Sequence, residues 1–276
     1  DARGYGSHTE TSIAQPLTQW YLAEGATTGF DLFYLIQNPG PDPATVQVRY
    51  LLPAPQAPLV KSYTVSGNSR FNIWVNVEQF DTPAGPQALL ASAELSVAFT
   101  SDRPVIVERA MYLSRNGRQF DAGHESAASP ELSTAWFLAE GATGPYFDLF
   151  ALIANPNDTA ATIDVTYLLG NSSFTKAYTV PGNSRFNIWV DQDDPRLADT
   201  AVSMSLRSTN AVPVLVERAM WWPGSFASWF EGHNSRGAIE TGEKWGLADG
   251  QVGGPFGIET YALVANTSAF EASVRV

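Results

Sequence analysis

The chain contains no cysteine, which excludes disulfides, thiol catalysis and zinc–thiolate sites. It also lacks a surplus of positive charge, because 16 Lys and Arg stand against 28 Asp and Glu and give a formal net charge of −12. Nucleic acids and anionic lipid surfaces both attract positively charged proteins, so neither is an expected partner. No apolar run approaches the roughly 20 residues that a membrane-spanning helix requires.

Turn-forming residues are abundant. The 276 residues include 22 Gly and 18 Pro, and their short spacing favours β structure over long helices. Hydrophobic residues make up 44% of the chain, which is enough to build folded cores rather than a disordered polymer. The length predicts two to three domains.

The sequence repeats itself. Residues 67–75 return letter for letter as residues 182–190, and the opening at Trp20 returns in related form at Trp136 and Trp245. Self-similarity at a long period indicates one structural unit used several times. We therefore expect four segments: 1–19, the tail of a preceding copy or a linker; 20–135, the first complete unit; 136–244, the second complete unit; and 245–276, the first three strands of a third.

Apolar and polar residues alternate along many short segments of the second copy, and this period of two is typical of half-buried strands. Turn residues separate these segments. Eight short strands in each unit predict an all-β fold of tandem immunoglobulin-like antiparallel β-sandwiches. The strands expected in the second copy are 135–139, 147–154, 161–169, 173–180, 184–190, 200–208, 213–221 and 226–231.

The partial third copy needs a partner, because three strands alone leave an unpaired edge and an exposed apolar face. Two interpretations are open. Either the protein continues beyond Val276 and this chain is a fragment, or a neighbouring subunit completes the sandwich by strand addition. The fragment interpretation is preferred, since residues 1–19 are too few to supply the missing strands.

Acidic residues recur at two positions of each complete unit. Glu24 and Glu140 lie in the opening loop, and Asp31 and Asp148 lie at the entry to the next strand. Carboxylates at loop ends are Ca²⁺ ligands, so these four are candidate calcium ligands, and we expect no other cofactor. Paired carboxylates also hydrolyse glycosides in some enzymes. However, their spacing matches no compact calcium loop.

Repeated arginines offer these carboxylates a simpler role. A charge that faces inward must be paired, and networks of this kind are common in structural cores and interfaces. We therefore expect structural ion pairs rather than a reactive site. The residues expected to form them are Arg70, Glu108, Arg109, Arg185, Glu217 and Arg218.

The three histidines, His8, His124 and His233, occur one per copy boundary. None has a second histidine nearby in sequence, so a zinc triad is not expected. Their position before each linker predicts that His124 and His233 contact a neighbouring unit, and that protonation near the usual pKa of about 6.5 loosens this contact. Alternation sends Trp74 and Trp189 to the outer sheet face, where we expect them to cover a linker or neighbouring unit.

Tryptophans also gather late in the second copy, at Trp221, Trp222 and Trp229. An exposed group of this kind would stack on sugar rings. Packing in a core or an interface is the other interpretation, because aromatic residues dominate both. The first copy carries Tyr112 and Leu113 in the corresponding region, so the group is not repeated.

Several motifs resemble those of tandem repeats in large secreted or surface-attached bacterial proteins, a family of unknown function. They are Trp-Tyr-Leu-Ala-Glu-Gly at Trp20, Leu-Ile-Ala-Asn-Pro at Leu152, Ser-Arg-Phe at Ser69 and Ser184, Val-Glu-Arg-Ala-Met-Tyr at Val107, and the Gly-His pair at Gly123. The resemblance implies a β-sandwich and an extracellular location. It transfers no catalytic residue.

These patterns predict a non-enzymatic structural or adhesive array of repeats in an extracellular surface protein or filament. Its expected partners are adjacent repeats and further copies of itself. The alternative is a carbohydrate-binding accessory module of a secreted polysaccharide-degrading enzyme, with glycans as partners. Loss of glycan binding on substitution of Trp222 would favour that alternative.

Overall fold

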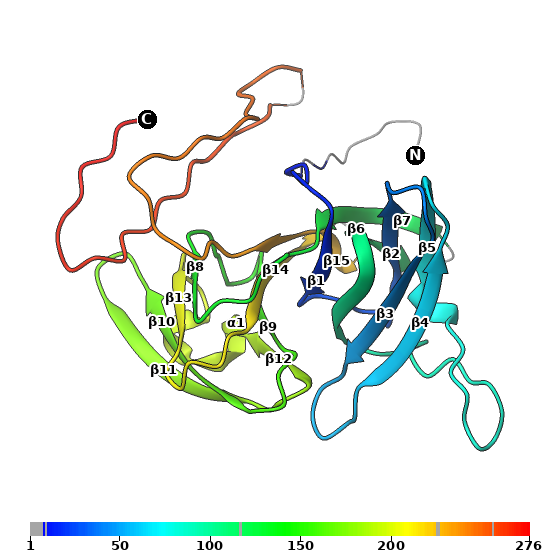
Figure 1. Ribbon diagram of the computed structural model, residues 1–276. Coiled ribbons are helices and arrows are strands. Elements are labelled where there is room, and N and C mark those ends of the chain that lie inside the picture. The colour runs from blue at the N-terminus through cyan, green and yellow to red at the C-terminus, as the bar shows by residue number, and fades with distance from the viewer. Residues whose placement is uncertain (1–7, 9, 116–117, 225–226, 256) are drawn as a thin grey trace.

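The computed structural model describes residues 8, 10–115, 118–224, 227–255 and 257–276. Antiparallel sheets dominate it, as the alternation of apolar and polar residues predicts (Figure 1). The chain forms two units of the same design, which we call the first unit (β1–β7) and the second unit (β8–β15). No helix in the described residues is both long and apolar enough to span a membrane.

The first unit pairs its strands through one long strand. The first half of β6 pairs with β1 and β3, and its second half pairs with β2 and β7. One strand thus belongs to two sheets, β4-β3-β6-β1 and β5-β2-β6-β7. The elements are β1 (Leu17–Leu22), β2 (Phe30–Asn38), β3 (Ala44–Leu51), β4 (Leu59–Val65), β5 (Ser69–Trp74), the short 3-10 turn η1 (Val75–Val77), β6 (Ser96–Arg115) and β7 (Arg118–Ala127).

The second unit repeats this order with the long strand divided in two. Its sheets run β11-β10-β13-β8 and β12-β9-β14-β15. The break falls between β13 and β14, where Pro213 lies. The elements are β8 (Ala135–Leu138), β9 (Asp148–Asn155), β10 (Ala161–Leu168), β11 (Ser173–Val180), β12 (Ser184–Trp189), α1 (Val190–Asp193), η2 (Pro195–Leu197), β13 (Ser203–Ser208), β14 (Leu215–Gly224) and β15 (Ala227–Arg236).

The strand order differs from that of an immunoglobulin domain, in which the first strand pairs with the second. Here β1 pairs with β6, and β8 pairs with β13. The indole N–H of Trp20 fixes this order by donating to the carbonyl of Val105 at 2.9 Å, and Trp136 donates to Val214 at 2.8 Å in the second unit. Alternation in sequence predicts strands, but it does not specify which strands become neighbours.

The two sheets of each unit pack through alternate buried side chains. In the first unit, Tyr34 of one sheet lies against Tyr50 and Phe99 of the other, with ring centroids 6.3 and 5.2 Å apart. All three side chains are almost completely buried. Burying large rings at the centre supplies the main hydrophobic stabilisation of such a unit.

The repeated nine-residue stretch forms a turn followed by an edge strand in both units. Asn68 and Asn183 take positive φ angles of 50° and 53°, which asparagine tolerates better than most residues. The preceding glycines have no room for a side chain, because a Cβ on Gly67 would lie 2.0 Å from the carbonyl oxygen of Pro41 and one on Gly182 would lie 2.2 Å from that of Asp158. This close backbone approach explains why glycine occupies both positions.

The strands expected in the third copy are not formed. The described part of residues 245–276 contains no named strand, and its apolar side chains are exposed, with Leu247 79% and Phe270 82% accessible. The segment extends away from the second unit (Figure 1). Strands need a neighbouring edge for their backbone hydrogen bonds, and this segment has none in the structure.

Candidate functional site

A polar interface joins the two units. The outer face of the second unit's β12-β9-β14-β15 sheet lies against the first unit, and it buries charged and polar groups as well as apolar ones. Arg185, Glu217 and Asn234 are 3%, 2% and 0% exposed. Burying such groups is costly unless each has a partner, so their partners define how the units fit together.

Arg109 lies at the centre of this interface and is fully buried. It belongs to β6 of the first unit, yet its guanidinium donates to the carboxylate of Glu217 on β14 at 2.9 Å and to the side-chain carbonyl of Asn234 on β15 at 2.6 Å. Within its own unit it donates to the backbone carbonyl of Glu24 at 2.8 Å and to the hydroxyl of Ser126. One planar side chain therefore links four strands or loops across the boundary.

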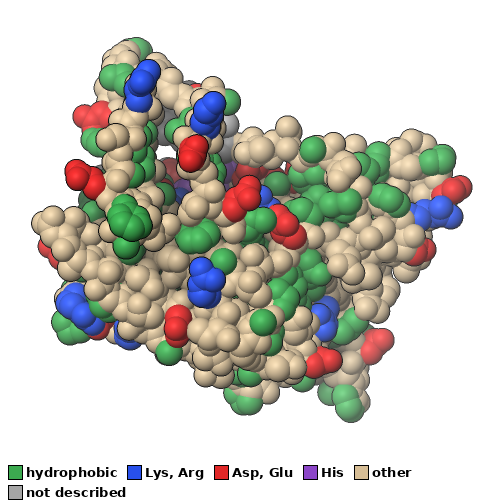
Figure 2. All heavy atoms as spheres, turned by 60° about the vertical axis from the view of Figure 1, so that its left-hand side comes forward, with side chains coloured by type: hydrophobic (Ala, Val, Ile, Leu, Met, Phe, Trp, Pro, Cys, Tyr) green, Lys and Arg blue, Asp and Glu red, His purple; other side chains and the backbone are tan. Residues whose placement is uncertain are grey.

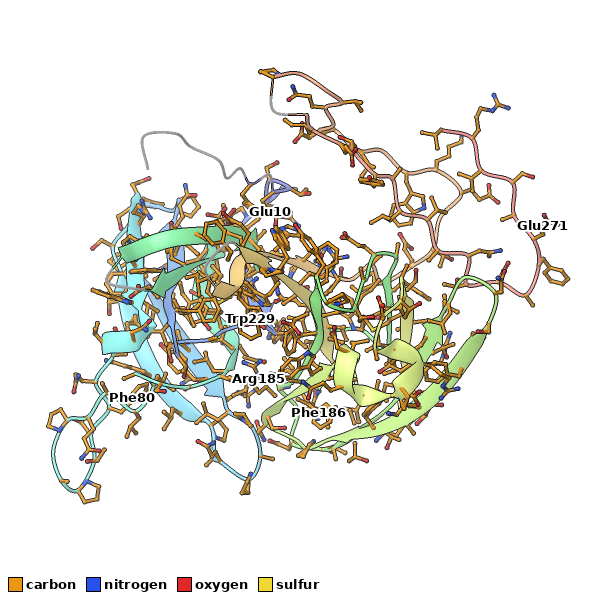
Figure 3. The ribbon with its side chains drawn as sticks, turned by 180° about the vertical axis from the view of Figure 1, so that it is seen from behind. Glu10, Phe80, Arg185, Phe186, Trp229 and Glu271 are labelled. Atoms are coloured by element: carbon orange, nitrogen blue, oxygen red, sulfur yellow. The ribbon has the colours of Figure 1, made fainter. Side chains whose placement is uncertain are left out.

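Arg185 crosses the interface in the opposite direction, from β12 of the second unit (Figure 3). It donates to the backbone carbonyls of Gly25 and Leu95 at 2.7 and 3.0 Å. Its guanidinium also lies 3.9 Å from the carboxylates of Glu24 and Glu94. A delocalised cation with five donors suits a site built mainly from carbonyl oxygens.

The rim of the interface is hydrogen-bonded as well. Arg49 of the first unit donates to the side chain of Asn183 at 2.8 Å and to the carbonyl of Pro156 at 2.5 Å. Asn187 of the second unit donates to Glu94 at 2.8 Å. The repeated turn and the repeated Asn-Pro segment thus take part in the contact between units.

The electrostatics of the interface follow from burial and charge pairing. Burial acts to lower the pKa of Arg109, but the charge of Glu217 and its hydrogen bond more than offset this effect and raise it. Burial raises the pKa of the Glu24 carboxyl, against the opposing charges of Arg185 and Arg109. The site thus keeps Arg109 charged and hydrogen-bonded, as a structural network requires.

The three histidines lie together beside this network. His124 is on β7 and His233 on β15, with ring centroids 6.4 Å apart, and His8 lies 6.3 and 5.6 Å from them. They come from equivalent positions of three successive copies, which is why no local pattern in the sequence announced the cluster. Burial, together with the charges of Arg109 and the other histidines, keeps the pKa of His124 well below its usual value.

This cluster changes the expected response to pH. Burial and the charge of Arg218 lower the pKa of His233 to about 4. The prediction that protonation occurs near pH 6.5 is therefore wrong for the ring of His233 in the folded protein. Within the described residues, no group of three or more His, Asp or Glu side chains is placed to hold a metal ion.

The remaining expected ion-pair residues lie on faces that the other unit does not cover. Arg218 pairs with Glu140 of its own unit at 2.8 Å. Arg70 is exposed and Glu108 is half-buried on the outer sheet face of the first unit. Thus the same sequence positions have different partners in the two units.

The candidate calcium ligands are engaged with protein groups. The carboxylate of Glu24 faces Arg185, that of Glu140 pairs with Arg218, and Asp148 accepts a hydrogen bond from the indole N–H of Trp229 at 2.5 Å. Asp31 is buried at the start of β2. The structure thus does not bring these four carboxylates together at one point.

Trp74 and Trp189 lie beside aromatic side chains of the neighbouring strand. Trp74 and Trp189 stack on Phe33 and Phe150, their cross-strand neighbours in the same unit, at 5.4 and 5.2 Å. Cross-strand pairing places these side chains next to each other.

Trp221 is one of the residues at that boundary. It is only 5% exposed and its ring lies 5.0 Å from that of Phe30 in the first unit. Trp229 stacks on Trp221 at 5.8 Å, and Trp222 lies 6.1 Å from Phe147. A ring buried between units has no free face for a sugar, so the glycan-stacking prediction is wrong for Trp221.

Sequence reasoning missed several groups that matter here. Asn234 and Ser126 accept from Arg109 but occupy positions that nothing in the sequence marked. The backbone carbonyls of Gly25 and Leu95 have no side-chain signature. The one available signal was repetition: an arginine conserved between two copies of an outer sheet face needs a partner outside its own unit.

Surface charge agrees with the composition. On the face that Figure 2 shows, Lys and Arg side chains are interspersed with Asp and Glu side chains rather than gathered into one patch. A nucleic-acid interface would require a continuous basic surface.

Comparisons with known proteins leave the family open. No family model matches the chain, and no curated protein does. Among solved structures, a protein described as Thermotoga maritima 1070 is similar at 18% identity over 41% of this chain and 99% of its own, with a TM-score of 0.36. An Anabaena sensory rhodopsin transducer is similar at 20% identity over 36% and 86%, with a TM-score of 0.28. These scores carry no functional inference.

Proposed function

We propose that this chain is a structural segment of an extracellular array of tandem β-sandwich repeats, and that it has no enzymatic activity. The observation that carries the proposal is the buried link between Arg109 of one unit and Glu217 of the next, 2.9 Å apart. A buried ion pair with further hydrogen bonds fixes a relative orientation more than it adds stability. A fixed orientation between repeats is the property that a stalk, filament or surface layer needs.

The supporting contacts are spread across the whole boundary. Arg185, Arg49 and Trp221 each join the two units at separate points. Three separated contacts prevent rotation about any one of them. In repeat arrays, stiffness arises from such nearest-neighbour interfaces used again and again.

The interface is also built from repeated sequence, which is what an array requires. Arg185 and Asn183 lie in the repeated stretch 182–190, and the matching stretch 67–75 is present in the first unit. A protein that evolved one catalytic or binding site would not need the same outer face twice. Repetition of a contact face is instead the rule in solenoids and tandem arrays.

A distance measured between labels on the two units tests whether their relative orientation is fixed. Ser62 on β4 and Ala177 on β11 are exposed, and the chain has no native cysteine, so Ser62→Cys and Ala177→Cys accept spin labels without competing thiols. Pulsed electron–electron double resonance between these two labels should give one narrow distance distribution. A broad distribution would refute a rigid junction. Immunogold electron microscopy of the native material tests the function, since the label should follow regular fibres or a surface layer.

A further inference from the structure

The first unit exposes a face whose counterpart in the second unit is covered. We call it the open face and define it by Leu35, Gln37, Arg70, Ile106 and Glu108, which point outward from β2, β5 and β6. Arg70 and Glu108 correspond in the repeat to Arg185 and Glu217, which are 3% and 2% exposed under the first unit. In the first unit the same positions are exposed and half-buried.

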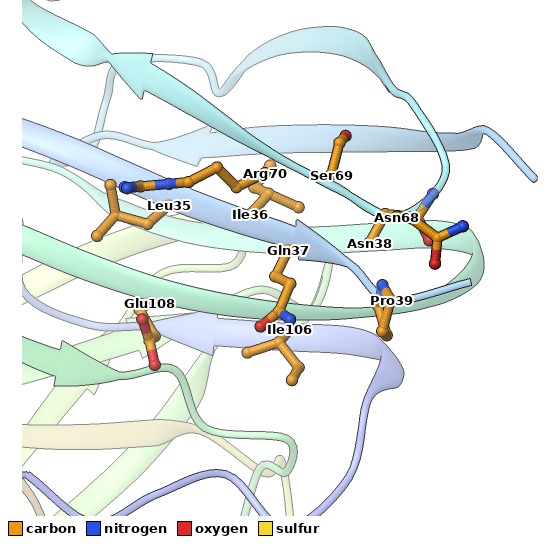
Figure 4. Close-up of a pocket in the computed structure, with 10 residues that line it drawn as sticks. All are labelled: Leu35, Ile36, Gln37, Asn38, Pro39, Asn68, Ser69, Arg70, Ile106 and Glu108. Atoms are coloured by element: carbon orange, nitrogen blue, oxygen red, sulfur yellow. The ribbon is translucent and has the colours of Figure 1, made fainter. Parts of the chain in front are cut away.

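The open face is hollowed. A depression of about 650 Å³ lies between β2, β5 and the second half of β6 (Figure 4). Its lining includes Pro39, Asn68, Arg70 and Glu108. The equivalent residues of the second unit are Pro156, Asn183, Arg185 and Glu217, and each of these four bonds to the first unit.

The opposite face of the second unit offers the groups that fit this hollow. Glu140, Gly141, Val202 and Arg218 correspond to Glu24, Gly25, Leu95 and Arg109, the groups that receive the second unit at the existing interface. The local backbone is the same in both places: the amide of Val202 donates to the carbonyl of Gly141 at 2.8 Å, as the amide of Leu95 donates to the carbonyl of Gly25 at 2.8 Å. The two carbonyls that would accept an incoming arginine are therefore already in position.

The charges of this Glu140–Arg218 face are paired differently while no other unit covers it. Glu140 turns to Arg218 at 2.8 Å, whereas at the covered interface Arg109 bonds the carboxylate of Glu217 from the other unit. Burial lowers the pKa of Arg218, although Glu140 opposes this effect. An incoming carboxylate at the position of Glu217 would give Arg218 the partner that Arg109 has.

We propose that the open face of the first unit binds the Glu140–Arg218 face of a second copy of this chain, with the geometry of the interface between the two units. Arg70 then donates to the carbonyls of Gly141 and Val202 of the partner, and Glu108 pairs with its Arg218. The proposal rests on the structural function above and specifies the surface through which the array extends. Because the two faces differ, the association is head-to-tail.

The charges near the N-terminal segment suit this placement. His8 corresponds to the histidine of a preceding copy, and its ring lies 6.3 Å from His124, while His124 lies 6.4 Å from His233. The ring of His8 also lies 5.6 Å from that of His233, so the three rings form one cluster at the boundary between the units. Carboxylates beside the open face, Glu108 and Glu125 with Glu10 near them, also match the positive charge of an incoming Arg218.

Sedimentation velocity of the whole chain over a range of concentrations tests the proposal. We expect concentration-dependent association that Arg70→Ala weakens at least tenfold. Arg196→Ala is the matched control, because Arg196 is 55% exposed and forms its ion pair with Asp194, two residues earlier on the same unit. A chain that stays monomeric at all concentrations, or associates equally well with Arg70→Ala, overturns the proposal.

A charge exchange distinguishes recognition from misfolding. Glu108→Arg should abolish association by facing Arg218 of the partner, and Glu108→Arg combined with Arg218→Glu should restore it. If circular dichroism shows that Arg218→Glu disturbs the fold, the comparison of Arg70→Ala with Arg196→Ala decides. A narrow spin-label distance in a chain that does not associate would refute this inference and leave the proposed structural function standing. A broad distance would refute the proposed structural function.

Discussion

Arg109 and Glu217 belong to different units, yet their charged groups lie 2.9 Å apart in a site that leaves 0% and 2% of their side chains exposed. The pair is isolated from water, so each charge depends on the other. Replacing both by apolar residues of similar volume would cost little, but removing one leaves an uncompensated buried charge. The junction is therefore sensitive to single substitutions, and equivalent residues elsewhere in the chain provide internal controls.

Glu217→Gln should lower the free energy of unfolding by about 3 kcal/mol, because it removes the carboxylate that is hydrogen-bonded to the buried guanidinium of Arg109. The matched control is Glu108→Gln, which changes the corresponding residue on the open face. At concentrations where the chain is monomeric, the control should change stability by less than about 0.5 kcal/mol. Urea denaturation measures both, and equal effects would contradict the distinct roles assigned to the two carboxylates.

Arg185→Ala should loosen the junction more than it destabilises either unit. It removes the hydrogen bonds that Arg185 donates to the buried carbonyls of Gly25 and Leu95. The carbonyl of Gly25 keeps the amide of Leu95 as a donor, so the expected cost is about 1–3 kcal/mol. The spin-label distance between positions 62 and 177 should broaden. Arg70→Ala in the monomer should leave that distance unchanged, and a broadening there would contradict the separation of the two faces.

Acid should destabilise the folded chain through its buried histidines. Burial and the charges of Arg218, His8 and Arg109 lower the pKa of His233 to about 4 in the folded state, against about 6.5 when unfolded. The unfolded chain therefore binds more protons in this range, and stability is lost as pH falls from about 6.5 towards 4. His124, also buried, acts in the same direction.

His233→Gln should remove about 2 kcal/mol of the stability difference between pH 7.5 and pH 5.

Glu125 works in the opposite direction, because burial and the charges of Glu108 and Glu10 raise its pKa to about 7. Its folded form binds more protons between about pH 4.5 and 7, which favours folding as pH falls. Glu125→Gln should thus steepen the loss of stability in acid. Thermal unfolding across this pH range measures both variants, and parallel curves for wild type and His233→Gln would refute the assignment.

Gly182→Ala should destabilise the second unit by at least about 2 kcal/mol, because the new methyl would lie 2.2 Å from the carbonyl oxygen of Asp158 and backbone must move to relieve it. Gly170→Ala is the matched control, since nothing lies within 4 Å of its Cβ position. The control should be neutral or slightly stabilising. Chemical denaturation of the two variants compares them, and a neutral Gly182→Ala would show that the turn has another conformation available.

Much of the fold was accessible from sequence because it depends on local patterning. Strands expected at 161–169, 173–180 and 184–190 are found as β10, β11 and β12 with ends within a residue or so. Alternation of side chains in a strand is a local property of the backbone. The third copy is the exception, since its alternation is just as clear and its strands are absent where no neighbouring edge exists.

Partners across the boundary were not accessible in this way. The sequence determines that Arg70 and Arg185 are chemically equivalent, that both lie on an outer sheet face, and that the units repeat. Only the tertiary structure decides that Arg185 is buried among carbonyls while Arg70 is exposed, and that His8, His124 and His233 meet. The physical reason is that the alternation of side chains is set over a few neighbouring residues. Burial and ion pairing instead depend on which surfaces meet, and these surfaces are more than a hundred residues apart in the sequence.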